Sequence, residues 1–302
     1  MKYFLVPVLS LALILLSALS GVVVALESDV PGKLFGQASY AVRTTLGLEK
    51  SWQTVPGPDQ ARDRQAVACP DPSEAVVVVT GGQSNAANVI PSLHRPVNDV
   101  SVWFDGTCYR AADPLLGALG RNGSLWSLLG DRMSETLGRP VLLINGAIGG
   151  TQFADWLDAR SGYYAALFER VAAAGRSGYR PDLILWHQGE TDAAVARDMA
   201  GLEREITALM DRFVADVPSA QVYLFRATRC VGKDRAEGVP AVNETLRRVA
   251  ARHGRTISGF DTDTLGREFR WDTCHFNSLG RERIVDRVVP ELVRYFQTAR
   301  AE

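Results

Sequence analysis

Residues 75–85 have the sequence Ala75-Val76-Val77-Val78-Val79-Thr80-Gly81-Gly82-Gln83-Ser84-Asn85. The apolar run predicts a buried central strand. The two glycines predict that it breaks into a tight turn, because glycine tolerates backbone angles that β-branched residues do not. A nucleophilic serine needs a position like that of Ser84, since its hydroxyl must project beyond the sheet toward a substrate. A lone Gly-Gly-x-Ser is nevertheless more often a plain polar turn, so the rest of the chain has to decide.

The same pattern of a short apolar strand followed by a turn recurs along the chain. Strands are predicted at 100–104, 141–145, 182–187, 221–226 and 256–260, and amphipathic helices at 125–137, 162–174, 202–213, 242–250 and 279–296. This alternation predicts an α/β fold, a three-layer α/β/α sandwich with a mostly parallel central sheet. Ligands of such sheets bind at the carboxyl ends of the strands, where the turns at Ser84, Gly150 and Gln188 should meet.

Composition excludes several classes of function. The 302 residues are 46% hydrophobic and carry 33 Lys and Arg against 34 Asp and Glu, a net charge of -1. No global field attracts nucleic acid or an anionic membrane, so neither is expected as a partner. The chain also lacks a CxxC pair, a His-Glu-x-x-His motif and a phosphate-binding loop, and we expect no metal and no cofactor.

The N-terminal part predicts export. An apolar segment at 4–26 follows Lys2, so residues 1–26 are expected to be a signal peptide or, if uncut, a membrane anchor. The protein would then be periplasmic or secreted, with membrane contact only through an uncut anchor. Prolines and glycines punctuate residues 27–68, for which we expect a loosely packed linker, and the folded domain is expected at 69–302.

Four cysteines in an exported chain suggest disulfide bonds. Three pairings are possible, and free buried thiols are a further alternative. We favour Cys69 with Cys108 and Cys230 with Cys274, since the latter two follow a predicted strand or stand beside a late histidine.

A nucleophilic Ser84 needs a base, and the chain offers His94, His187, His253 and His275. His94 has no nearby group to orient its ring, His187 ends a buried strand, and His253 ends a helix. His275 follows Asp272 by three residues, so that carboxylate can accept from Nδ1 and leave Nε2 facing the serine. His275 is therefore the predicted base, although Asp-x-x-His alone is more often a surface turn.

An esterase also needs donors for the oxyanion. We expect the backbone N–H groups of Ser84 and Gly150 and the side-chain amide of Gln188 to serve, because glycine lets the backbone approach a substrate closely. Gln83 and Asn85 are expected to hold the turn by hydrogen bonds from side chain to backbone.

Four segments together resemble the ordered blocks of the SGNH hydrolases. They are Gly82-Gln83-Ser84-Asn85, Asn145 with Gly149-Gly150, His187-Gln188-Gly189-Glu190-Thr191-Asp192, and Asp272-x-x-His275. The chain is most similar to the branch of sialate O-acetylesterases and carbohydrate esterase family 6 acetyl xylan esterases. The resemblance implies a flavodoxin-like fold and metal-independent ester hydrolysis through an acyl-enzyme, with Ser84 as nucleophile, His275 as base and Asp272 orienting it.

The third block departs from the commonest SGNH pattern, where an asparagine donates to the oxyanion. Gln188 and Glu190 occupy that turn, and an ionised carboxylate cannot donate. We therefore favour Gln188 as the donor and expect a supporting structural role for Glu190.

The sequence thus predicts a serine esterase, an acetylesterase that acts on O-acetyl groups of sugars or glycans. One alternative is a metal-dependent hydrolase built from His187, Glu190, Asp192, Asp272 and His275. A second is an exported glycan-binding protein that keeps the fold without turnover.

Overall fold

The computed structural model describes residues 53–195, 197–230 and 238–298. The signal peptide or anchor expected at residues 1–26 lies outside these ranges. Within them, no helix combines the length and the apolar character needed to cross a membrane.

A seven-stranded sheet forms the centre of the fold. Its strands are β1 (Val76–Gly82), β2 (Val100–Phe104), β3 (Thr107–Arg110), β4 (Val141–Ala147), β5 (Leu183–His187), β6 (Gln221–Arg226) and β7 (Thr256–Asp261). They lie in the order β3-β2-β4-β1-β5-β6-β7, and every neighbouring pair is parallel except β2 with β3. The strand that carries the valine run is therefore central, and residues Val76–Val79 are fully buried.

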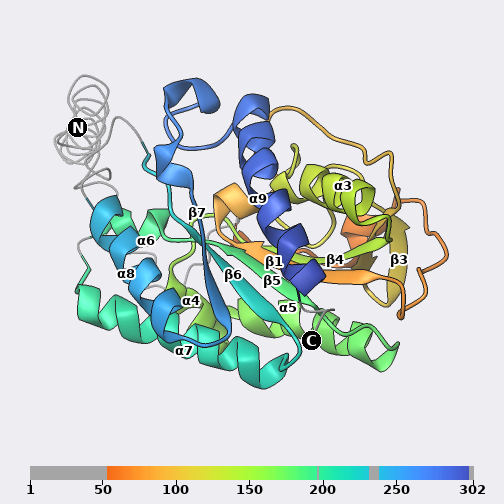
Figure 1. The fold of residues 1–302 in the computed structure, drawn as a ribbon, viewed down its shortest axis with the longest axis horizontal. Helices are drawn as coiled ribbons and strands as arrows, with labels where there is room; N and C mark the ends of the chain where they lie inside the picture. The colour runs from red at the N-terminus through yellow and green to blue at the C-terminus, as the bar shows by residue number, and fades with distance from the viewer. Residues whose placement is uncertain (1–52, 196, 231–237, 299–302) are drawn as a thin grey trace, which may run out of the picture. The chain divides into compact units, whose positions relative to one another are not determined.

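Helices cover both faces of this sheet (Figure 1). They are α3 (Leu125–Leu137), α4 (Phe153–Leu157), α5 (Tyr163–Arg176), α6 (Glu190–Ala194), α7 (Met199–Asp216), α8 (Val239–Arg252) and α9 (Ser278–Thr298), with 3-10 turns η2 (Pro58–Ala61), η3 (Ser84–Ala86), η4 (Ala159–Ser161), η5 (Thr262–Thr264) and η6 (Arg267–Phe269). One hydrophobic cluster packs α4, α5, α7 and α8 against one face, and a second packs α3 and α9 against the other. The predicted three-layer α/β/α sandwich is confirmed.

Three short elements were not predicted. Strand β3 has four residues at the edge of the sheet, and helices α4 and α6 have five residues each. Segments this short span less than two periods of a helix or a few positions of a strand, so hydrophobic periodicity does not reveal them.

The described part of the expected linker packs on the domain. Gln60 Nε2 donates to the carbonyl of Ala118 at 2.8 Å, and the backbone N–H of Gly117 donates to Gln60 Oε1 at 2.6 Å. The described residues from Gln53 onward belong to the same compact unit as the sheet. Residues 53–68 therefore form part of the folded domain, and loose packing is the wrong expectation for them, because hydrogen bonds hold this stretch without any periodic signal.

Both expected disulfide bonds are present, Cys69–Cys108 and Cys230–Cys274. The first joins the segment before β1 to β3. The second joins the chain beyond β6 to the loop that carries His275.

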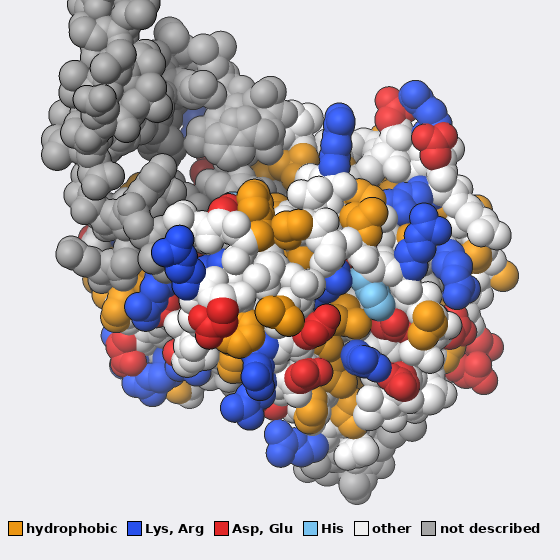
Figure 2. Space-filling view, turned by 90° about the horizontal axis from the view of Figure 1, so that it is seen from above, with side chains coloured by type: hydrophobic (Ala, Val, Ile, Leu, Met, Phe, Trp, Pro, Cys, Tyr) orange, Lys and Arg blue, Asp and Glu red, His pale blue; other side chains and the backbone are white. Residues whose placement is uncertain are grey.

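The surface carries mixed charge. Figure 2 shows Lys and Arg side chains interspersed with Asp and Glu over the face in view.

Candidate active site

The turn after β1 depends on glycine. A Cβ atom on Gly82 would collide with the carbonyl oxygen of His187 on the adjacent β5, and one on Gly81 would collide with the Trp186 ring. Gly82 also has φ +124, which L side chains rarely adopt. The strand therefore ends tight against β5, and Ser84 follows at the start of η3, half-buried at the carboxyl end of the sheet.

The turn after β4 lies beside this serine. A Cβ built on Gly149 would stand 3.7 Å from Ser84 Cβ, and the next residue, Gly150, has φ +70. No described residue accepts a hydrogen bond from the backbone N–H of Ser84 or Gly150. The role expected for both N–H groups as oxyanion donors stays a prediction.

Gln188 is fully buried. Its Nε2 donates to the carbonyl oxygen of Thr151 at 3.3 Å, while Oε1 has no partner within the described chain. One N–H of the amide therefore holds the turn after β4, and one remains for another acceptor. Its role as an oxyanion donor also stays a prediction.

Asp272 and His275 form a hydrogen-bonded pair. His275 Nδ1 lies 2.7 Å from Asp272 Oδ2, and Asp272 Oδ1 accepts from the backbone N–H groups of Cys274 and His275, both at 2.6 Å. Burial raises the pKa of the Asp272 carboxyl, but these hydrogen bonds outweigh burial and bring the pKa below its ordinary value. The carboxylate is thus anionic at neutral pH, which assigns the proton to Nδ1 and leaves Nε2 as an acceptor.

The loop of His275 is attached to the turn of Ser84 through their neighbours. The backbone N–H of Phe276 donates to Asn85 Oδ1 at 3.4 Å, which joins the residue after His275 to the residue after Ser84. Within the described ranges, no hydrogen bond links the Ser84 hydroxyl to His275. Catalytic hydrogen bonds are often long without substrate, so this geometry leaves the prediction of a triad open.

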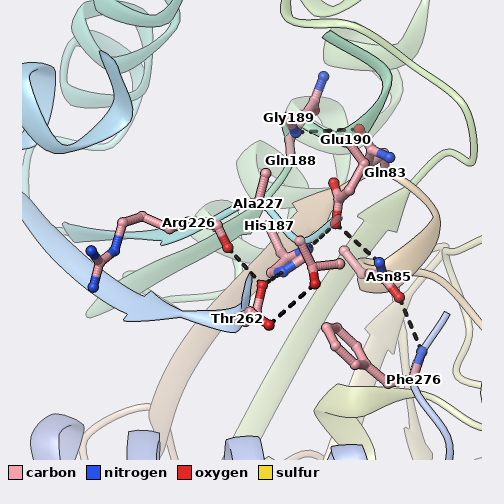
Figure 3. Close-up of polar contacts among 12 residues, drawn as sticks. Gln83, Asn85, His187, Gln188, Gly189, Glu190, Arg226, Ala227, Thr262 and Phe276 are labelled. Atoms are coloured by element: carbon pink, nitrogen blue, oxygen red, sulfur yellow. Dashed lines mark hydrogen bonds and ion pairs between the residues drawn. The ribbon is translucent and has the colours of Figure 1, made fainter. Parts of the chain in front are cut away.

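Gln83 and Asn85 brace the turn across the sheet edge (Figure 3). Gln83 Oε1 accepts from the backbone N–H groups of Gly189 and Thr191, at 3.2 and 3.1 Å. Asn85 Nδ2 donates to Glu190 Oε1 at 3.0 Å. Their partners come from the loop after β5, so the turn of Ser84 is held by the loop of a neighbouring strand.

His187 is a core residue, as its place at the end of β5 predicts. It is fully buried, its ring lies near those of Phe225 and Phe276, and its Nε2 bonds to Thr262 Oγ1 at 3.1 Å. In the ranges that the structure covers, no three His, Cys, Asp or Glu side chains gather where they could hold a metal ion. The metal-hydrolase alternative therefore has no ligand cluster among the described residues.

The expectation for His94 is wrong. Its Nε2 lies 2.8 Å from Asp131 Oδ2, and Asp131 Oδ1 accepts from the backbone N–H groups of Val97 and Asn98. Asp131 stands 37 positions away on α3, where sequence adjacency gives no hint of it. This second histidine–carboxylate pair fastens a loop to α3, whereas the His275 loop is bonded to the turn of Ser84.

Two further features of the site escaped sequence reasoning. Asn85 links the two loops, and the Trp271 ring lies beside the His275 ring, with centroids 6.0 Å apart and an interplanar angle of 20°. Trp271 is 51% exposed. Its position one residue before Asp272 was the only available signal.

A separate cavity of about 610 Å³ lies at the opposite edge of the sheet, between α5 and α7. Tyr164 and Arg212 line it, together with Pro181 and Pro218, which precede β5 and β6. It is therefore distinct from the cluster at the strand ends.

Solved structures share this fold. A protein from Arabidopsis thaliana is 16% identical, with a TM-score of 0.58 over 75% of this chain and 99% of its own. NanS is 16% identical, with a TM-score of 0.54 over 77% of this chain and 100% of its own. A family 3 carbohydrate esterase from Talaromyces cellulolyticus is 14% identical, with a TM-score of 0.51 over 74% of this chain and 99% of its own. At such identities the likeness shows the fold alone.

The sequence relationship rests on a match to a protein-family model. The chain has no significant match among curated proteins. The model described as carbohydrate esterase, sialic acid-specific acetylesterase, matches residues 76–293, which include β1, the turn of Ser84 and the pair of Asp272 and His275. The chain therefore belongs to this family of carbohydrate esterases and is a carboxylic ester hydrolase.

Proposed function

We propose that this protein is a serine esterase that removes O-acetyl groups from sugars or glycans, with Ser84 as nucleophile, His275 as base and Asp272 as the group that orients the base. The observation that carries the proposal is the Asp272–His275 pair, joined at 2.7 Å, on a loop bonded to the residue after Ser84. Membership of an acetylesterase family supports the reaction type.

The chemistry follows from the proton positions. His275 Nε2 takes the Ser84 proton as Oγ attacks the acetyl carbonyl carbon, and the imidazolium that forms faces the anionic Asp272. The carbonyl oxygen becomes an oxyanion, for which we assign the backbone N–H groups of Ser84 and Gly150 and the Gln188 amide as donors. His275 then protonates the leaving alkoxide, and a water that it activates releases acetate from the serine.

Trp271 supports a sugar as the alcohol part of the ester. Its half-exposed indole lies beside the imidazole of His275. A flat aromatic side chain of this kind offers apolar area on which the C–H face of a sugar ring can pack. The alcohol released by His275 would leave next to this surface.

Two disulfide bonds fit a protein of an oxidising, extracellular compartment. We therefore propose that the chain acts outside the cytoplasm.

Ser84→Ala tests the reaction in purified protein. We expect hydrolysis of p-nitrophenyl acetate to fall at least about 10³-fold, because the attacking oxygen is lost. A fluorophosphonate probe should label the wild type and not the variant. Ser73→Ala is the matched control, since Ser73 is exposed and precedes β1 whereas Ser84 follows it.

Wild-type turnover by Ser84→Ala would refute the serine mechanism. A wild type that binds acetylated saccharides without labelling would favour the glycan-binding alternative. Equal kcat/KM for ethyl acetate and for every member of a panel of acetylated sugars would remove the sugar part of the proposal.

A further inference from the structure

A buried histidine–glutamate pair lies beside Asn85, the residue after the candidate nucleophile (Figure 3). His187 Nδ1 faces Glu190 Oε1 at 3.5 Å, and both side chains are almost completely shielded from solvent. The mechanism above gives neither residue a chemical task. Burying two titratable side chains away from water is costly unless their charges are paired or neutralised, so the pair is expected to have a structural or functional role.

The hydrogen bonds of Thr262 determine which ring nitrogen of His187 carries a proton. The Thr262 hydroxyl donates its single proton to the carbonyl oxygen of Arg226 at 2.7 Å. Its oxygen can therefore only accept from His187 Nε2, 3.1 Å away. Nε2 thus carries a proton, and Nδ1 is the nitrogen that remains to be satisfied.

No hydrogen-bond partner satisfies Nδ1 within the described chain. Glu190 Oε1 lies 3.5 Å from it. Two lone pairs that face each other at 3.5 Å in a medium of low polarity repel, whereas one proton between them gives an attractive contact and leaves the pair without net charge.

The surrounding groups act on His187 in opposite directions, and their net effect lowers its pKa. Burial lowers the pKa of His187, the carboxylate of Glu190 raises it, and the guanidinium of Arg270 lowers it further. Arg270 is itself bound to the carbonyl oxygens of Cys274 and Leu265. Burial and Arg270 thus disfavour a lone imidazolium, and the Glu190 carboxylate 3.5 Å away is the neighbouring group that favours a proton at Nδ1.

Glu190 and the backbone N–H of Phe276 together fix the orientation of the Asn85 side-chain amide. Asn85 Oδ1 accepts from the Phe276 N–H, which turns Nδ2 toward Glu190 Oε1 at 3.0 Å. Asn85 follows Ser84, and Phe276 follows His275. One carboxylate oxygen therefore connects the core of the protein to both loops of the candidate site.

We propose that His187 and Glu190 share one proton and together lock the Asn85 side chain, so that Glu190 is a positioning residue that holds the turn of Ser84 against the loop of His275. The inference rests on the proposed roles of Ser84 and His275. A displacement of about 1 Å at a reacting group can cost about 10²-fold in rate. The lock has no expected contact with substrate, so its loss should lower kcat and leave KM unchanged.

The isosteric change Glu190→Gln tests the shared proton. An amide cannot accept from Asn85 and donate to His187 through the same atom, so one of the two contacts fails. We expect kcat for p-nitrophenyl acetate to fall about 10- to 100-fold with KM within about twofold of wild type. A Glu190 that only fills space would tolerate glutamine, and unchanged kcat would refute the proposal.

The double variant Asn85→Asp with Glu190→Gln restores the hydrogen bond between residues 85 and 190, with residue 190 now as the donor and residue 85 as the acceptor. One N–H of the new amide can donate to the new carboxylate and the other to His187 Nδ1, while the carboxylate still accepts from Phe276. We expect the single Asn85→Asp variant to be impaired, and the double variant to recover kcat about tenfold over the poorer single. If the fold-losses in kcat of the two single variants simply multiplied in the double variant, the two sites would be independent, because the free-energy effects of independent sites add. That result would contradict the lock.

Tyr164→Phe is the control for general destabilisation. It removes a 2.6 Å hydrogen bond to Asp216 at the opposite edge of the sheet. This variant should lower Tm and leave kcat unchanged. A loss of kcat that follows Tm alone across all the variants would overturn the positioning role.

Nuclear magnetic resonance of the ¹⁵N-histidine-labelled wild type measures the protonation of the two His187 ring nitrogens directly. This experiment needs neither enzymatic turnover nor a folded variant. We expect both ring nitrogens of His187 to show protonated or strongly hydrogen-bonded shifts at pH 7. A bare, unbonded Nδ1 would refute the shared proton. If the wild type neither hydrolyses esters nor labels at Ser84, the proposed function fails, while the resonance result still decides whether the pair shares a proton.

Discussion

At the scale of single residues, the two shortest histidine–carboxylate contacts among the described residues have nearly equal geometry. His94 and Asp131 lie 2.8 Å apart, and His275 and Asp272 lie 2.7 Å apart. The pairs differ in what surrounds them. The first is bonded to the loop at 97–98, and the second is bonded through Phe276 to the residue beside Ser84.

Asp272→Asn and Asp131→Asn form a matched test of this distinction. An asparagine at 272 can donate to Nδ1 and hold the imidazole in the wrong tautomer, so we expect kcat to fall by about 10³- to 10⁴-fold. The same change at 131 should leave kcat within about threefold of wild type. Steady-state kinetics on an aryl acetate measures both, and equal losses would mean that His94 takes part in the reaction.

At the scale of elements, a disulfide bond from beyond β6 and a hydrogen bond within the loop hold the segment between β7 and α9. The Cys230–Cys274 bond and the 3.0 Å hydrogen bond from Arg270 to the carbonyl of Cys274 both act on the residue before His275. The Cys69–Cys108 bond instead holds the segment before β1 against β3. The two disulfides close loops of similar length, with sequence separations of 44 and 39, but only one adjoins the candidate base.

Replacing each cysteine pair by serine separates stability from positioning. Loop-closure entropy predicts that Cys230→Ser with Cys274→Ser, and Cys69→Ser with Cys108→Ser, each lower the free energy of unfolding by about 4 kcal/mol. We expect only the first double variant also to lower kcat at temperatures where both remain folded. Chemical denaturation and kinetics measure the two effects, and equal kcat in both variants would argue against a positioning role for the first bond.

At the scale of the whole molecule, buried carboxyls make stability depend on pH. Burial raises the pKa of Asp192 to about 7, against the opposing effects of Arg197 and the backbone N–H of Phe153. The folded state therefore binds this proton more tightly than the unfolded state. Its contribution is most favourable below about pH 4 and is lost as the pH rises toward about 7.

Asp192→Asn should flatten this dependence. Between pH 4 and pH 8 the free energy of unfolding of the wild type should fall relative to the variant by up to about 4 kcal/mol, the equivalent of a shift of about three pH units. The lowered pKa of Asp272 acts only at more acid pH, and the raised pKa of the buried Asp113 is present in both proteins. Urea unfolding across this range measures the difference, and parallel curves would contradict the shift.

Local sequence determined the layers of the fold. A run of buried valines, strands of five to seven residues and amphipathic helices give a periodic signal within a single window, so the sheet and its covering were predictable. The turn of Ser84 was predictable from Gly81 and Gly82, whereas the contacts with Trp186 and His187 of β5 that require these glycines come from the fold. The pair of Asp272 and His275 was predictable because three residues in one loop cannot separate far.

Tertiary structure alone decided what surrounds these residues. Nothing in the sequence connects Asn85 with Glu190 and Phe276, which are 105 and 191 positions away, or His94 with Asp131 on another element. Such contacts depend on which strand ends become neighbours, and strand order arises from packing of the whole sheet. Ser84 was thus recognisable as a possible nucleophile from its own stretch, but the lock at Asn85, the next residue, exists only because β1 and β5 lie side by side.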